Sequence, residues 1–139
     1  MAQTLKAFFK QNAAQIPNKN VVISSRFKGE DGKPIEWELK ALDAGTQQDI
    51  RTKAMEMSAA GGQKNVKMRF NTALANILTA VNAVVFPDLC DKDLQDSYDA
   101  KKPEELIGKM LFPDEFDKLI DEISAFSESP EGIEEEAKN

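Results

Sequence analysis

The sequence contains no histidine, one cysteine (Cys90) and one tryptophan (Trp37) among its 139 residues. The missing histidine removes the commonest general acid–base group and the commonest transition-metal ligand. A lone cysteine excludes a disulfide within the chain and any zinc site built from several cysteines. Cys90 has no histidine to activate it and lies among aspartates, which argues against a nucleophilic role. These absences favour a binding or assembly protein over an enzyme.

The chain also lacks a hydrophobic run of membrane-spanning length. Residues 71–87 carry no charge, but this stretch is shorter than the roughly 20 apolar residues of a membrane helix and is interrupted by threonines and asparagines. The first ten residues hold Lys6 and Lys10 and no long apolar stretch, so we do not expect them to form a signal peptide. We therefore expect a cytoplasmic protein without a membrane partner.

No motif for a metal, phosphate or cofactor emerges from the sequence. Five aspartates cluster between residues 88 and 99, but a calcium-binding loop that begins at Asp91 has Asp96 and Lys102 where glycine and glutamate are needed. Gly61 and Gly62 lack the surrounding pattern of a phosphate-binding loop. We predict no catalytic residues, no metal and no cofactor, although carboxylates that the fold brings together remain an alternative.

Charge is distributed unevenly along the chain. Residues 1–70 carry a net charge of +5, residues 71–111 of −3 and residues 112–139 of −8. Acidic residues interleave with the basic ones of the first half, and the net charge of −6 repels a phosphate backbone. The strand pattern also turns Phe27 and Trp37 toward the core, away from any base. A nucleic acid partner is therefore not expected. The basic residues that could form a face for one are Arg26, Lys28, Lys33, Lys40, Lys64, Lys67 and Arg69.

Hydrophobic periodicity predicts an α+β fold, mostly helical, with a small antiparallel hairpin sheet. The first half contains an amphipathic helix over residues 4–16 and a hairpin over residues 20–43 with Trp37 on its buried face. A second helix opens at Thr46, which begins a capping-box pattern, and runs to Met57. Residues 58–63 favour a flexible loop, and residues 66–70 favour either a strand or a partly ordered segment.

The second half contains a central buried helix over residues 71–86, which Asn71 caps and Pro87 stops. Short helices follow over residues 91–98, 103–111 and 113–126, and the last two begin with proline and acidic residues. Residues 128–139 are acidic and are expected to be disordered. We predict one domain over residues 1–127 with this tail attached.

Seven short segments of the chain form a distinctive combination. They are Ser25-Arg26-Phe27-Lys28, Asp31-Gly32-Lys33-Pro34-Ile35, Trp37-Glu38, Val85-Phe86-Pro87-Asp88-Leu89, Asp93-Leu94-Gln95-Asp96-Ser97-Tyr98, Lys109-Met110-Leu111 and Pro113-Asp114-Glu115-Phe116. Together they resemble the XkdN-like tail assembly chaperones of phages and PBSX-type prophages of Gram-positive bacteria. The resemblance covers about residues 20–126 and is specific in its combination of the tryptophan hairpin with the segments that follow.

The resemblance implies a non-enzymatic chaperone that binds the tape measure protein and keeps it soluble during tail assembly. The alternative is a structural tail or head-completion protein that stays in the phage particle. Self-association into a homo-oligomer is left open. We expect partner contacts at five phenylalanines, for each of which ordinary core packing is the alternative. They are Phe8, Phe9, Phe112, Phe116 and Phe126.

Overall fold

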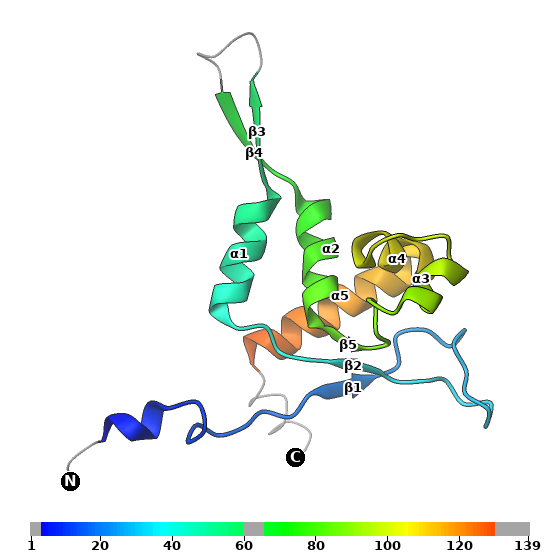
Figure 1. The fold of residues 1–139 in the computed structure, drawn as a ribbon, viewed down its shortest axis with the longest axis horizontal. Coiled ribbons are helices and arrows are strands. Elements are labelled where there is room, and N and C mark those ends of the chain that lie inside the picture. Colours follow the sequence, from blue (N-terminus) through cyan, green and yellow to red (C-terminus); the bar gives the residue numbers. More distant parts are fainter. Residues whose placement is uncertain (1–3, 60–65, 130–139) are drawn as a thin grey trace.

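The structure is a computed structural model that describes residues 4–59 and 66–129 (Figure 1). The fold is α+β, as predicted, with the helices on one side of a small antiparallel sheet. The predicted acidic tail falls outside the described residues from Pro130 onward, and most of the predicted loop at residues 58–63 does so as well.

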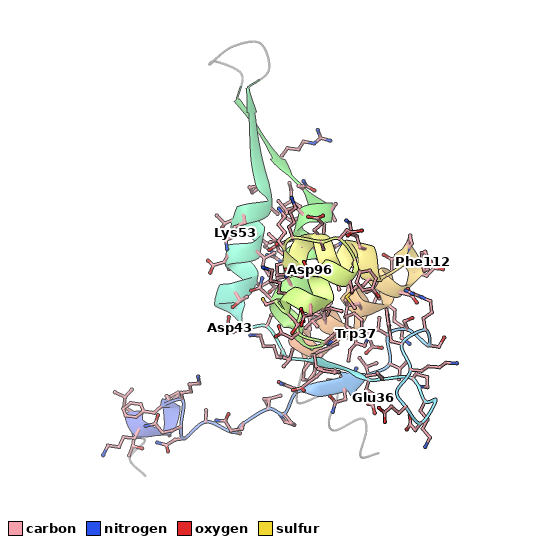
Figure 2. All side chains as sticks on the ribbon, turned by 45° about the vertical axis from the view of Figure 1, so that its right-hand side comes forward. Glu36, Trp37, Asp43, Lys53, Asp96 and Phe112 are labelled. Atoms are coloured by element: carbon pink, nitrogen blue, oxygen red, sulfur yellow. The ribbon has the colours of Figure 1, made fainter. Side chains whose placement is uncertain are left out.

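The sheet has three strands in the order β1 (Lys19–Val21), β2 (Trp37–Leu39) and β5 (Val84–Phe86). Strands β1 and β2 form the predicted hairpin, although each is shorter than expected, and Val21 pairs with Trp37. Alternation along β2 directs Trp37 and Leu39 into the core, where their exposed fractions are 1% and 0%. Figure 2 shows Trp37 between the sheet and the helices.

The helices are α1 (Ala44–Ala54), α2 (Thr72–Ala83), α3 (Lys92–Ser97), α4 (Pro103–Met110) and α5 (Pro113–Glu128). Helix α2 is central, because it packs against α1, α4 and α5. Asn71 caps it as predicted, since its Oδ1 accepts a hydrogen bond from the backbone N–H of Leu74 at 3.0 Å. The three predicted C-terminal helices are confirmed to within two residues at each end.

The end of the central helix differs from the prediction. Helix α2 stops at Ala83, and Val84 to Phe86 form strand β5 against β2. The backbone N–H of Lys40 donates to the carbonyl of Ala83 at 2.9 Å, directly at this transition. Branched and aromatic side chains favour strands, so pairing with the open edge of the hairpin prevails over helix continuation.

The beginning and end of α1 also differ from the prediction. The cap is Asp43, whose Oδ1 accepts from the backbone N–H of Thr46 at 2.7 Å, so the helix begins earlier than the expected capping box. Its end at Ala54 precedes β3 (Met55–Ala59), which pairs in register with β4 (Val66–Phe70). The strand alternative for residues 66–70 is thus confirmed, and the two strands project beyond α1 and α2 (Figure 1).

The predicted helix over residues 4–16 is wrong. Only Leu5–Phe8 form a short 3-10 helix, and the segment leads away from the body of the molecule (Figure 1). A helix of this length is marginal in water unless its apolar face is buried. Within residues 4–18 only Ile16 is even partly buried, so the packing that a full helix needs is absent.

Candidate partner-binding surface

A groove lies where α2, α4 and α5 meet. It has a volume of about 370 Å³, enough for several apolar side chains of a partner. Helix α4 directs Leu106, Ile107 and Met110 inward and leaves Gly108 exposed. A Cβ atom added at Gly108 would meet no atom within 4 Å, so the missing side chain keeps this wall open. The residues that line what we call the α4–α5 groove are Ile77, Gly108, Leu111, Pro113, Phe116 and Asp117.

The turn between α4 and α5 exposes an aromatic ring, Phe112, whose two neighbours in sequence line this groove. Leu111 faces the core, whereas Phe112, the next residue, is 64% exposed. Pro113 begins α5 and cannot donate a backbone hydrogen bond, which suits the first turn of a helix. The carboxylate of Glu115 accepts from the backbone N–H of Phe112 at 2.9 Å and closes the turn.

An ion pair joins this turn to the segment that follows β1. The Arg26 guanidinium donates to both carboxylate oxygens of Glu115, at 2.6 Å from Nη2 and 3.1 Å from Nε. Nη2 also donates to the carbonyl of Met110 at 2.8 Å, and the Ser24 hydroxyl hydrogen-bonds Glu115. The guanidinium lies 4.8 Å from the centre of the Phe112 ring, within cation–π distance.

These contacts change the acidity of Glu115. The hydrogen bond from Arg26 contributes most and that from Ser24 next, and together they lower the pKa of Glu115 from 4.5 to about 2. The carboxylate is therefore ionised throughout the physiological pH range and stays bound to Arg26. The pair joins residues 89 positions apart in the sequence, so it holds the α4–α5 turn to the loop that follows β1.

One of the five predicted contact residues, Phe116, lines the α4–α5 groove. A second, Phe112, projects at the edge of the helical part (Figure 2). Phe8 and Phe9 lie far from them on the N-terminal segment, at 79% and 42% exposure. Phe126 is only 4% exposed and packs in the core. This agrees with ordinary core packing, the alternative to a partner contact.

Sequence reasoning missed the other residues of the groove. Periodicity places Ile77 on the buried central helix, and Gly108 gives no signal beyond its small size inside a helical pattern. The ion pair between Arg26 and Glu115 is not predictable from local sequence either, because the two residues are far apart in the chain. Of the aromatic residues weighed for base stacking, Trp37 is buried and therefore unavailable at the surface.

Two further observations apply to residues 4–59 and 66–129. No helix in these ranges is long and apolar enough to cross a membrane. The same part of the chain holds no cluster of three or more cysteine, aspartate or glutamate side chains arranged to bind a metal ion.

Comparison with known proteins identifies a solved structure with the same fold and a family to which the sequence matches. The crystal structure of a protein named YqbN superposes with a TM-score of 0.72 over 91% of this chain and 98% of that one. The sequence identity of that pair is 16%, so this likeness shows the fold alone. The phage-like element PBSX protein XkdN of Bacillus subtilis (strain 168) is 26% identical, over 97% of this chain and 93% of that protein.

A family model described as the phage XkdN-like tail assembly chaperone protein matches residues 5–138, nearly the whole chain. The match includes the hairpin, the central helix and the α4–α5 groove. Its description is that of a chaperone of phage assembly, whose partner is a phage protein, and not that of an enzyme. The chain therefore belongs to the phage XkdN-like tail assembly chaperone family.

Proposed function

We propose that this protein binds the tape measure protein in the bacterial cytoplasm and keeps it soluble during tail assembly, without catalysis. The observation that carries the proposal is the family match over residues 5–138. The α4–α5 groove supports it, because amphipathic helices of partner proteins commonly bind in open apolar grooves between helices.

The size of the groove suits a transient contact. Its apolar walls offer room for a few side chains, and burial contributes roughly 25 cal/mol per Å² of apolar surface. Such a contact is weak at any one position. Many copies bound along one long client hold it soluble through their number, and each copy still dissociates when assembly proceeds. We assign Phe116 to the wall of this groove and Phe112 to its rim as client contacts.

A substitution at Gly108 tests the groove without disturbing the core. Gly108→Trp places a large ring in the groove, whereas Gly108→Ala adds one methyl group that meets no neighbour. In co-expression with the tape measure protein of the same phage element, the wild type and Gly108→Ala should raise the soluble fraction of that protein. Gly108→Trp should not, although it remains folded by circular dichroism.

Two results would count against the proposal in different ways. A client that is equally soluble with and without this protein contradicts the chaperone function itself. A client that Gly108→Trp keeps as soluble as the wild type does contradicts only the location of the site. Purified phage particles supply a further check, because a chaperone should be absent from them and a structural tail or head-completion protein present in stoichiometric amount.

A further inference from the structure

A second apolar concavity, separate from the α4–α5 groove, lies between the sheet and α3. Its volume is about 180 Å³, and it is open to solvent at Ile35 and Phe86, which are 37% and 51% exposed. We call it the Trp37 hollow after the buried ring at its base. Its walls include Phe27, Ile35, Trp37, Phe86, Leu94 and Tyr98.

The hollow has the size of one aromatic ring. An apolar protein cavity of about 150 Å³ binds benzene, so about 180 Å³ accepts a phenyl group. Aromatic side chains already line it, and the rings of Phe27 and Trp37 lie tilted to each other with centres 6.3 Å apart. An incoming ring would meet them at ordinary aromatic packing distances.

The same chain carries a phenyl ring, Phe8, that is largely exposed to solvent. Residues 4–18, which we call the N-terminal arm, contain Leu5 and Phe8 at 75% and 79% exposure. Large apolar side chains exposed together on one segment indicate an interaction site. The arm joins the beginning of β1, whereas Phe27 and Ile35 lie on the loop that leaves the other end of β1 (Figure 1). The arm thus leads away from the hollow of its own molecule.

Charge is complementary between the two surfaces. The N-terminal arm has two lysines, Lys6 and Lys10, and no acidic residue. Leu94 and Tyr98, on one wall of the Trp37 hollow, belong to residues 88–99, which hold five aspartates and one lysine. Residues 26–36, which include Phe27 and Ile35 of the opposite wall, hold three basic and three acidic residues, so the two segments together carry a net charge of −4 and complement the charge of +2 on the arm.

From this match we infer that the N-terminal arm of one copy docks on a second copy, with Phe8 inserted into the Trp37 hollow. The contact is heterologous, since arm and hollow are different surfaces: the copy that donates its arm keeps its hollow free, and the copy that accepts it keeps its arm free for a further copy. It involves neither Gly108 nor Phe116, so it is independent of client binding at the α4–α5 groove.

Sedimentation of the full chain at increasing concentration tests the contact. The wild type should self-associate, and Phe8→Ser should weaken the association at least tenfold because it removes the buried ring. Ala14→Ser is the matched control, since Ala14 is also exposed on the arm but is not the inserted ring, and it should associate like the wild type. A wild type that stays monomeric, or a Phe8→Ser variant that associates equally well, would overturn the inference.

Disulfide trapping distinguishes a contact between copies from one within a copy. In a Cys90→Ser background, one variant carries Ala7→Cys beside the intact Phe8 and another carries Ile35→Cys, and the two are mixed and oxidised. We expect a covalent dimer from the mixture and a much lower yield when Ala14→Cys replaces Ala7→Cys. The double variant Ala7→Cys/Ile35→Cys should give covalent multimers. If it gives mainly an internally bridged monomer, the arm binds its own hollow and the inference is wrong.

Discussion

Replacing Glu115 with glutamine tests how the α4–α5 turn is held in place. The variant keeps the size of the side chain but removes the charge that binds Arg26 and Ser24. The fall in the pKa of Glu115 from 4.5 to about 2 corresponds to at most about 3 kcal/mol of folding free energy. The Arg26 side chain is 42% exposed, so solvent screening reduces the expected loss in the Glu115→Gln variant to about 1–2 kcal/mol.

The loss of unfolding free energy in the Glu115→Gln variant should become smaller as the pH falls. Above about pH 5 Glu115 is ionised in both the folded and the unfolded chain, and the ion pair stabilises the folded state in full. As the pH falls from about 4.5 toward 2, the unfolded chain binds the proton first, and this stabilisation disappears. The difference in unfolding free energy between wild type and Glu115→Gln should therefore shrink from its value at pH 7 to near zero at about pH 2.

Urea unfolding followed by circular dichroism at pH 7, 5, 4 and 3 measures this difference. Asp121→Asn is the control, because Asp121 is an exposed carboxylate on the same helix, and it should change stability by less than about 0.5 kcal/mol. A Glu115→Gln variant as stable as the wild type at pH 7 would refute the reasoning. So would a loss that stays constant down to pH 3.

Three further substitutions test the core, a helix cap and a turn by the same unfolding measurement at pH 7. Trp37→Ala should cost about 3–5 kcal/mol, because it empties a site that is 1% exposed, and a loss below about 1 kcal/mol would contradict the burial of this ring. Asn71→Ala should cost about 1 kcal/mol by removing the cap of α2, and unchanged stability would show that the cap is dispensable. Gly32→Ala should cost about 1 kcal/mol, since φ is +79° there, and a gain in stability would contradict that conformation.

The elements that sequence predicted best are those with strong local signals. The central helix has an uncharged apolar pattern and a clear cap at Asn71, and α4 and α5 each begin with proline and acidic residues. The hairpin with Trp37 follows from alternation and from a turn-rich loop. These features depend on residues that are close together in the chain, so they can be predicted from one sequence without an alignment.

The elements that sequence predicted worst depend on contacts between distant segments. Strand β5 exists because β2 offers an edge to Val84 and Phe86, more than 40 residues away from it in the chain. The N-terminal segment has the pattern of an amphipathic helix, but residues 4–15 stay exposed and pack on no described part of their own molecule. The α4–α5 groove depends on the approach of Ile77 to Gly108 and Phe116, which periodicity alone does not give.

The most direct test of the proposed function is the composition of the complex with the client. Affinity-tagged tape measure protein of the same phage element, co-expressed with the untagged full chain, is purified and analysed by light scattering. Our account predicts a soluble complex that contains one client and several copies of this protein, and that loses those copies when Gly108→Trp replaces the wild type. A tape measure protein that purifies in soluble form without this chain bound would contradict it.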